Sequence, residues 1–497
     1  MRRTLRSGNS FGMWDGEAID VVDTQFDLAQ YVKRGIDDER DELSDEDCDY
    51  DYIEADVLSD AFIDARKPPT AAANAPAAFG ENPTTHTPDS AFSAYQRPKR
   101  RTREHRKRKR LEAKPAAEEE EGVATRESTR RKYIDTALPI ETNLPLSGLR
   151  VTRTGYTSMR DAPDQHRAYR VDELVGPKSK FQFDYFAWAG RQPVPFLSKQ
   201  KVFGLLAGCP DKAPDWDTVM IDFANTIHAA RPDLALRSNQ KYHRRGPFPA
   251  TAHGHSYGGG QRQPMSISEN PANAGPFKRV LEHPGMTRIS GFQNGVVKTW
   301  APDYHSFLRE NRRSMRSQHP DLRYNFRNSV WSATTINYGP RTATLPHKDF
   351  SNLPWGWCPI TALGNYDPKR GGHLVLWELR LVVEFPPGST IIIPSSLITH
   401  SNTTVGPGET RFSVTQYTAG ALVRWVDQGF QTKEAFLASL TPEGRAAEEV
   451  KAKSRYLRGL GMYSTLDDLR TRHENGGEDS DSDLTELEDE SEVGSDR

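Results

Sequence analysis

The stretch EFPPGSTIIIPSSLITH, residues 384–400, contains a Gly/Pro turn, a run of three isoleucines and a histidine. Similar runs flank it on both sides: NSVWSATTINY at 328–338, HLVLWELRLVVEF at 373–385 and RFSVTQYTA at 411–419. Runs this short and this rich in β-branched and aromatic residues predict β-strands, and the Gly/Pro segments between them predict turns. Several such strands in succession predict a closed all-β unit, such as a double-sheet jelly roll, over residues 326–430.

Helices are expected on both sides of this core. Val219, Phe223 and Ile227 are four residues apart and predict a helix within 211–238. We expect a second helix at 302–317, a Gly/Pro-rich loop at 244–264, and helices again at the C-terminal side. The predicted fold class is therefore α+β: a helical and loop part at 141–325, the jelly-roll core at 326–430, and C-terminal helices at 431–470.

The two ends of the chain have a different composition. Residues 1–140 contain the acidic stretch IDDERDELSDEDCDYDYIEAD at 36–56 and the basic run RPKRRTREHRKRKR at 97–110, and residues 471–497 are acidic. Such segments cannot bury enough apolar surface to offset the entropy of ordering, so long disordered tails are expected. The basic run predicts a nuclear localisation signal; the alternative is a solvated charged segment with no receptor.

The overall composition is that of an intracellular protein. The 497 residues carry a net charge of only -2, which hides the segregation of charge in the tails. The cysteines are Cys48, Cys209 and Cys358, without a CxxC pair, which favours a reducing compartment over a disulfide framework. The N-terminus lacks an apolar signal-peptide region, and no apolar run approaches the roughly 18 residues of a membrane span.

Two H-x-D tripeptides are candidates for a metal site. Side chains alternate along a strand, so the His and Asp of H-x-D share one face. His319-Pro-Asp321 contains a proline and is expected to be a turn, whereas His347-Lys-Asp349 follows a predicted strand. His400 comes 53 residues after His347, directly after the isoleucine strand. The set His347, Asp349 and His400 predicts the 2-His-1-carboxylate triad of a mononuclear non-haem iron centre; His347 alone could equally be a loop histidine.

Arg411 follows His400 by 11 residues and opens the next predicted strand. In a jelly roll this spacing allows adjacent strands to direct both side chains into one interior. A guanidinium can grip a carboxylate with two parallel hydrogen bonds, so Arg411 is a candidate partner for a dicarboxylate cosubstrate. Ser413 lies two residues on and faces the same way. The alternative for Arg411 is a cation on the sheet surface.

These motifs together resemble a known family. The matching segments are LPHKDFSN at 345–352, GNYDPKRGGHLVLWEL at 364–379, FPPGSTIIIPSSLITHSN at 385–402 and GETRFSVTQYTAG at 408–420. They resemble the TET/JBP-type 2-oxoglutarate-Fe(II) dioxygenases, and more closely the mushroom-type fungal Tet-like oxygenase domain group. The similarity covers about 325–430, with a weaker part toward 240. It implies a double-stranded β-helix, nuclear action, and oxidation of a methyl group on a nucleic-acid base, foremost 5-methylcytosine in DNA to 5-hydroxymethylcytosine and further products.

The resemblance also implies site roles for seven residues. These are the iron ligands His347, Asp349 and His400, the 2-oxoglutarate contacts Arg411, Ser413 and Asn337, and the target-base contact Asn352. For Asn352 the alternative is a turn-forming side chain, and for Asn337 it is a buried, hydrogen-bonded strand residue. Trp355, Trp357 and Tyr366 are aromatic candidates for stacking on the substrate, with core packing as the alternative for at least one tryptophan.

The sequence also departs from the family. Three cysteines cannot form the cysteine-rich zinc module of the animal proteins. The expected partners are DNA with a flipped methylated base, 2-oxoglutarate and O2, with no membrane. Two alternatives stay open: the same chemistry on a protein or other substrate, and a catalytically idle nuclear module that binds DNA or chromatin.

Overall fold

The computed structural model describes residues 2–4, 10–12, 19–20, 127–160, 167–211 and 213–472. The acidic stretch at 36–56, the basic run at 97–110 and the acidic tail from 473 lie outside the described residues. The disorder and the nuclear signal assigned to them therefore stay predictions.

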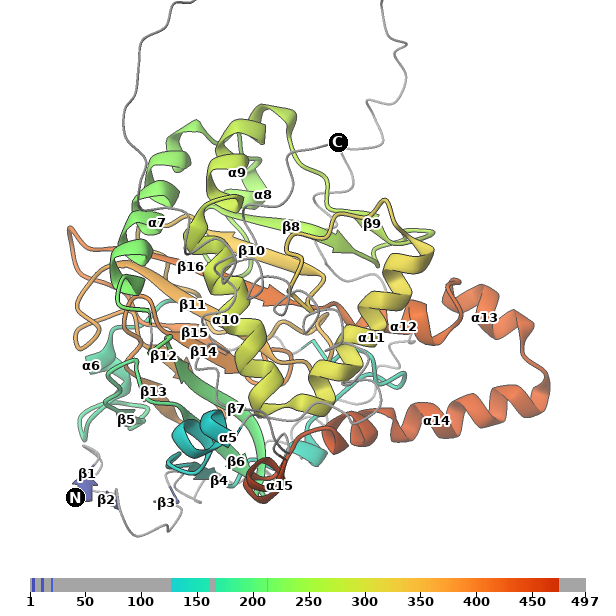
Figure 1. Cartoon of the computed structure of the whole chain (residues 1–497), viewed down its shortest axis with the longest axis horizontal. Helices are drawn as coiled ribbons and strands as arrows, with labels where there is room; N and C mark the ends of the chain where they lie inside the picture. The colour runs from blue at the N-terminus through green and yellow to red at the C-terminus, as the bar shows by residue number, and fades with distance from the viewer. Residues whose placement is uncertain are drawn as a thin grey trace, which may run out of the picture. The chain divides into compact units, whose positions relative to one another are not determined.

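The described chain is a mixture of helices and strands (Figure 1). Its strands are β1 Arg2–Thr4, β2 Ser10–Gly12, β3 Ile19–Asp20, β4 Ile140–Thr142, β5 Asp184–Phe186, β6 Val194–Ser198, β7 Lys201–Gly208, β8 Ala250–Ser256, β9 Met265–Ser266, β10 Ala333–Asn337, β11 Cys358–Asn365, β12 Leu374–Leu376, β13 Leu381–Val383, β14 Thr390–Ile393, β15 His400–Asn402 and β16 Thr410–Tyr417. Its helices are α5 Glu127–Thr129, η1 Arg130–Ile134, η2 Leu146–Gly148, α6 Val171–Leu174, α7 Trp216–Ala230, η3 Arg231–Asp233, α8 Ser238–Lys241, η4 Pro271–Asn273, α9 Ala274–Leu281, α10 Pro284–Trp300, α11 Pro302–Gln318, α12 Gly420–Asp427, α13 Lys433–Ser439, α14 Pro442–Gly461 and α15 Leu466–Thr471.

The strands form a large and a small sheet, besides the pair β1–β2. The large sheet has ten strands in the order β3-β4-β6-β7-β14-β11-β16-β10-β8-β9, and the small sheet has four in the order β15-β12-β13-β5. All four strand-rich runs of the sequence contain strands, and the run at 373–385 is the hairpin β12–β13. Strand β11 was not predicted, because Pro359 and Ala362 lower its strand propensity, yet it lies between β14 and β16.

The loop predicted at residues 244–264 was wrong in part, because this segment contains a strand. Strand β8 lies within this segment and pairs with β10 along its length. Its glycine permits close packing rather than a turn: Gly254 has φ +114°, and a Cβ there would lie 2.2 Å from the carbonyl oxygen of Ser332. Glycine in a strand interior often marks such a close approach of two backbones.

Strands also occur N-terminal to the predicted core, where we expected only helices and loops. The buried run KVFGLLAG forms β7, which pairs with β14 of the predicted core, and β5 pairs with β13. Ordered chain begins earlier than the boundary at 140 as well, since helices α5 and η1 precede it and Ile134 is buried in the main core. The division into separate parts at 140, 325, 430 and 470 remains a prediction.

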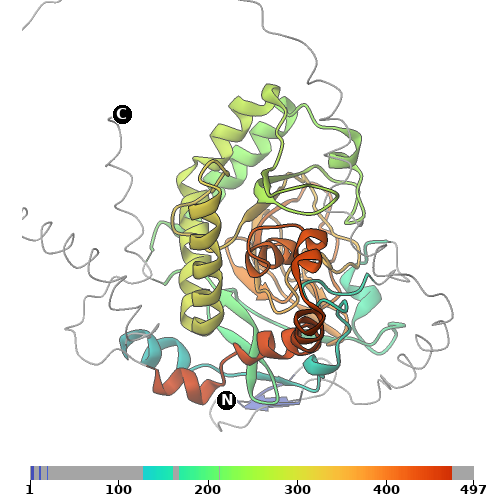
Figure 2. The ribbon, with the colours of Figure 1, turned by 90° about the vertical axis from the view of Figure 1, so that its right-hand side faces the viewer.

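Helices α7 and α10 lie side by side against the large sheet, with α9 and α11 beside them (Figures 1 and 2). Their apolar faces join the strands in one continuous core. The predicted helices at 211–238 and 302–317 correspond to α7 and α11, and the predicted C-terminal helical region holds α13, α14 and α15. None of the helices in the described ranges combines the length and apolar character that a membrane span needs.

Candidate metal centre

The two segments that carry the triad are joined by backbone hydrogen bonds. The His347 N–H donates to the His400 carbonyl at 3.1 Å, and the His400 N–H donates to the His347 carbonyl at 3.0 Å. His400 begins strand β15, whereas His347 lies in an extended loop that forms an isolated bridge to it. His347-Lys-Asp349 follows strand β10, as predicted, but strand alternation does not apply to it because the tripeptide lies outside the strands. The bridge fixes the loop backbone instead, so it still directs both histidines to one side.

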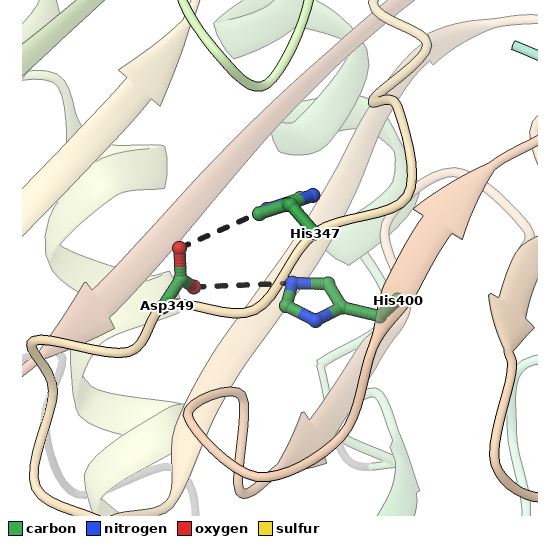
Figure 3. Close-up of side chains that lie close together, drawn as sticks. All are labelled: His347, Asp349 and His400. Atoms are coloured by element: carbon green, nitrogen blue, oxygen red, sulfur yellow. Dashed lines mark ion pairs between the residues drawn. The ribbon is translucent and has the colours of Figure 1, made fainter. Parts of the chain in front are cut away.

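The three side chains converge (Figure 3). His347 Nε2 lies 3.7 Å from Asp349 Oδ1, and His400 Nε2 lies 3.8 Å from Asp349 Oδ2. One ligand atom from each residue lies within 4.8 Å of the other two. Because metal–nitrogen and metal–oxygen bonds are about 2 Å long, one ion could contact all three residues from the space between them. The triad could therefore hold a metal ion.

Both imidazoles are oriented by carbonyl oxygens behind them. His347 Nδ1 lies 2.7 Å from the Leu345 carbonyl, and His400 Nδ1 lies 2.9 Å from the Ile398 carbonyl. A carbonyl oxygen only accepts hydrogen bonds, so each Nδ1 carries the proton and each Nε2 presents its lone pair. This is the usual arrangement behind a metal-bound histidine, and it fixes both the tautomer and the ring orientation.

The electrostatics favour the ligand forms of the side chains. Burial, with His400 close by, holds the pKa of His347 well below its ordinary value, so this ring stays neutral. Burial raises the pKa of Asp349, but its electrostatic interactions with His347, His400 and the Arg244 guanidinium outweigh burial and bring that pKa below its usual range. A neutral imidazole and an ionised carboxylate are the forms that bind a cation.

Further residues hold the loop between the first two ligands. The Arg244 guanidinium donates to the Lys348 carbonyl at 2.8 Å and to Asp349 Oδ1 at 3.2 Å. On the other side, the Lys348 ammonium lies 3.6 Å from the Glu378 carboxylate. Glu378 in turn accepts from both the backbone N–H and the hydroxyl of Thr399, each at 2.8 Å. Glu378 thereby links Lys348, which lies between His347 and Asp349, to Thr399, which precedes His400.

Arg411 is a fully buried cation with unused donors. Its Nη1 donates to the Thr342 carbonyl at 3.1 Å, whereas its Nε and Nη2 have no hydrogen-bond partner among the described residues, although the Tyr366 side chain interacts electrostatically with the guanidinium. The side chain is 0% exposed, so the predicted alternative of a surface cation is excluded. An unsatisfied buried guanidinium is costly and calls for an anionic partner. A carboxylate placed against these two donors would satisfy both.

Small and polar residues lie next to Arg411. Opposite Arg411 and Ser413, strand β11 presents Gly364 and Ala362, which occupy little space. Asn337 Nδ2 donates to the Ser413 hydroxyl at 2.8 Å, and Asn337 Oδ1 is buried with no hydrogen-bond partner in the part of the chain that the structure describes. The three residues expected to contact 2-oxoglutarate thus lie on two paired strands of the large sheet. This bonding of Asn337 is compatible with both the predicted contact with 2-oxoglutarate and the alternative of a buried, hydrogen-bonded strand residue.

One segment links this group to the triad. The Thr342 N–H donates to the Arg411 carbonyl at 3.0 Å, and the Asn402 N–H donates to the Thr344 carbonyl at 3.1 Å. The chain then reaches His347 and its bridge to His400. Residues 340–347 therefore run from β16 of the large sheet to β15 of the small sheet, so the two groups of predicted residues face one connecting segment.

Asn352 lies at a turn beyond the triad. Its backbone N–H donates to the Asp349 carbonyl at 2.9 Å, and its buried Nδ2 approaches Ser395 Oγ at 3.4 Å and Cys358 Sγ at 3.5 Å. This bonding matches the turn-forming alternative. Of the aromatic candidates, Trp355 and Trp357 are buried in the main core, and the Tyr366 hydroxyl donates to the Phe385 carbonyl.

The second H-x-D tripeptide plays no part in the site. The Leu322 N–H donates to the His319 carbonyl, which closes the turn expected for His319-Pro-Asp321. His319 Nε2 accepts from the Trp425 indole at 3.0 Å instead. The choice of His347 and Asp349 over this pair agrees with their positions in the structure.

Comparison with known proteins adds little to this geometry. No protein-family model matches the chain, and no curated protein matches its sequence. Among solved structures, the chain is similar to NgTET1 in complex with 5mC DNA, with a TM-score of 0.30 and 12% sequence identity over 48% of this chain and 84% of that chain. A likeness at this level supports no conclusion about activity, so the function rests on the residues themselves.

Sequence reasoning missed Arg244 and Glu378. Arg244 belongs to the segment 241–245, KYHRR, whose basic and aromatic character was a usable signal. Glu378 stands in the apolar run HLVLWEL, where a lone carboxylate indicates a buried polar partner. In neither case does the sequence show which residue is contacted.

Proposed function

We propose that this protein is an Fe(II)- and 2-oxoglutarate-dependent dioxygenase that oxidises a methyl group on a nucleic-acid base, foremost 5-methylcytosine in DNA. The proposal rests above all on the convergence of His347, Asp349 and His400, each histidine with its Nδ1 bonded to a carbonyl. Two histidines and one carboxylate leave other coordination positions open, which is the ligand set of non-haem iron oxygenases. The two sheets would then be the halves of a double-stranded β-helix.

The cosubstrate is supported by the buried guanidinium. The two unpartnered donors of Arg411 would bind the far carboxylate of 2-oxoglutarate, and the Ser413 hydroxyl would add a contact. When bound, Fe(II) with 2-oxoglutarate and O2 supplies the oxidation: the 2-oxo acid leaves as succinate and CO2, and one oxygen atom enters a substrate C–H bond. The carbonyls behind both histidines fix the ring orientation, so that each Nε2 would be available to hold the metal.

The substrate part of the proposal comes from the sequence resemblance. A methylated base in a duplex must leave the stack to reach the centre, which costs a few kcal/mol and requires compensating contacts. The nuclear location belongs to the same proposal and rests on residues 97–110. Imaging a tagged full-length chain, with and without glutamine at the basic positions of that run, tests the location.

The activity test uses the full chain purified without oxygen. Fe(II), 2-oxoglutarate and DNA containing 5-methylcytosine are added, and nucleosides and succinate are measured by mass spectrometry. We expect 5-hydroxymethylcytosine from the wild type and none from Asp349→Asn, with Asp321→Asn, in the second H-x-D tripeptide, as the matched control that keeps activity.

The outcomes separate the alternatives. Succinate without oxidised cytosine would point to the same chemistry on a protein or other substrate. No metal binding and no consumption of 2-oxoglutarate would leave the idle DNA- or chromatin-binding module, and would overturn the proposal.

A further inference from the structure

Two segments that flank the metal-binding loop are basic and contain no acidic residue. One is 142–160, with Arg150, Arg153 and Arg160, and the other is 234–268, which includes KYHRR at 241–245. The chain as a whole has slightly more acidic than basic residues, with a net charge of -2. A local excess of positive charge beside a candidate active centre attracts an anionic substrate.

The second segment presents two arginines directly to the metal-binding loop. His243 and Gly246 exchange backbone hydrogen bonds of 2.9 and 3.3 Å, which places Arg244 and Arg245 at the tip of a tight turn. The Arg245 carbonyl accepts from the Leu345 N–H at 2.9 Å. The turn is thus bonded both to Leu345 and, through Arg244, to Asp349.

The first segment, residues 142–160, adds the cation Arg160 beside Phe350. Phe350 directly follows the metal-ligand candidate Asp349. The Ser158 N–H donates to the Phe350 carbonyl at 3.0 Å. The Arg160 guanidinium lies 5.6 Å from the centre of the Phe350 ring, and that of Arg244 lies 5.3 Å from it. Two guanidinium groups therefore lie against one ring next to Asp349.

Tyr242 gives this surface an aromatic component. It is 68% exposed, the second most exposed of the large hydrophobic side chains in the described chain that lie at the surface. It stands next to Lys241 and two residues from Arg244. Exposed aromatic rings among cations are typical of surfaces that bind single-stranded nucleic acid, because any base can stack on the ring while the cations contact phosphates. An acidic peptide would use the cations but gain nothing from the ring.

We propose that Arg160, Lys241, Tyr242, Arg244 and Arg245, here called the arginine rim, bind the nucleic-acid strand on either side of the reacting base. Arg160, Lys241 and Arg245 contact phosphates, and a base adjacent to the target stacks on Tyr242. This inference rests on the proposed function, because it concerns the substrate of the same centre. It specifies that substrate as a nucleic-acid strand with unstacked bases. Trp355 and Trp357 are buried and cannot take the stacking role.

The test measures binding rather than turnover. A fluorescein-labelled single-stranded oligonucleotide with one 5-methylcytosine is titrated with the full chain, and anisotropy is followed over a series of salt concentrations. Basic residues of 97–110 are replaced by glutamine in every variant, so that this run does not dominate binding. Arg244 is left unchanged, because its contact with Asp349 would mix binding with metal-site effects.

The rim variants are Tyr242→Ala, Tyr242→Phe, Arg160→Gln and Arg245→Gln. Tyr242→Ala is expected to weaken binding on the order of tenfold without changing the salt dependence, and Tyr242→Phe to bind as the wild type. Each Arg→Gln change is expected to reduce the slope of log K against log salt by about 0.7. Leu457→Ala and Arg458→Gln on α14, both at exposed positions, are matched controls expected to change neither quantity.

Wild-type affinity and slope in Tyr242→Ala, Arg160→Gln and Arg245→Gln would overturn the inference, as would equal competition by a poly-glutamate peptide of the same charge. The proposed function fails separately, on loss of metal binding or 2-oxoglutarate turnover measured without DNA. Weaker binding by the rim variants in a chain that never consumes 2-oxoglutarate would support the rim and overturn the oxygenase.

Discussion

His347 and His400, 53 positions apart in the chain, exchange two backbone hydrogen bonds of 3.1 and 3.0 Å. Their side chains lie side by side as a result, with ring centres 4.3 Å apart. An ion bound to both rings and to Asp349 can bind only when this pairing is formed. Metal binding and folding of the two segments should therefore be linked thermodynamically.

The first prediction follows from this linkage. Fe(II) added without oxygen, or Mn(II) as a redox-stable probe, should raise the Tm of the wild type and not that of Asp349→Asn. At an ion concentration 100 times Kd the stabilisation should be about 2.7 kcal/mol. Thermal denaturation followed by circular dichroism measures it. Asp321→Asn should respond like the wild type, and an equal shift in Asp349→Asn would place the ion elsewhere.

The second prediction separates binding from stability at Arg411. Replacing this residue by methionine removes a buried charge whose Nε and Nη2 have no hydrogen-bond partner among the described residues, so the unfolding free energy without ligand should stay unchanged or increase. The increase in Tm that 2-oxoglutarate produces in the metal-loaded wild type should be lost. Urea unfolding and thermal shifts measure the two effects. A large loss of stability in ligand-free Arg411→Met would show that the cation is mainly structural.

The third prediction concerns the contact between Lys348 and Glu378. Glu378→Ala removes the carboxylate that holds both the loop between the first two ligands and Thr399. Contacts of this kind behind metal ligands are worth about 10- to 100-fold in metal affinity. Isothermal titration with Mn(II) should show a loss of that size, with an unchanged number of sites. Glu443→Ala, at an exposed position on α14, is the control, and equal affinity in both variants would contradict the prediction.

The fourth prediction is a pH dependence of stability. Burial lowers the pKa of His255 and of His373 to about 4. In the unfolded chain both titrate near an ordinary value of about 6.5, so between these values the unfolded state binds more protons and stability falls as the pH falls. Above about pH 6.5 both histidines are neutral in both states and do not reduce stability. Near pH 4 each one lowers the free energy of unfolding by about 3 kcal/mol.

Urea midpoints at about pH 5 and pH 7.5 measure this effect. His373→Asn should lose less stability between the two conditions than the wild type, even if its stability at the higher pH is lower. An unchanged difference would mean that His373 takes up its proton equally well in both states.

The fifth prediction uses two glycines of α14. A Cβ on Gly459 would lie 2.1 Å from the Trp355 ring, whereas a Cβ on Gly461 would meet nothing within 4 Å. Gly459→Ala should therefore destabilise the fold by about 1–3 kcal/mol through overpacking. Gly461→Ala should be neutral or stabilise by about 0.5–1 kcal/mol, because alanine is the better helix former. Urea unfolding of both variants decides whether α14 depends on this contact.

Strands with a strong apolar pattern could be predicted, and those that rely on partners could not. The isoleucines of β14 and the apolar hairpin β12–β13 show their conformation in the local sequence. Strand β8 does not, because its Gly254 permits a close approach to the backbone of Ser332, which lies 78 positions away in the sequence. The same limit applies to β11, which is kept extended by its two neighbours rather than by its own residue types.

The candidate site shows the same division. The identities of the triad and of Arg411 follow from residue chemistry and order along the chain. Their surroundings do not, since the contacts of Arg244 with Asp349 and of Glu378 with Thr399 join residues that no local pattern connects. The base-contact role for Asn352 was carried over from resemblance alone, and its buried amide has local partners instead.

Strand β14 has a neighbour on each side: β11 from the predicted core and β7 from well before it. A shortened recombinant fragment that begins after Gly208 would retain the three isoleucines but leave one side of their backbone with unsatisfied donors and acceptors. Such an exposed apolar edge recruits other chains. Fragments confined to the segment with the recognisable motifs should therefore aggregate on expression, and soluble material should require the hairpin formed by residues 194–208.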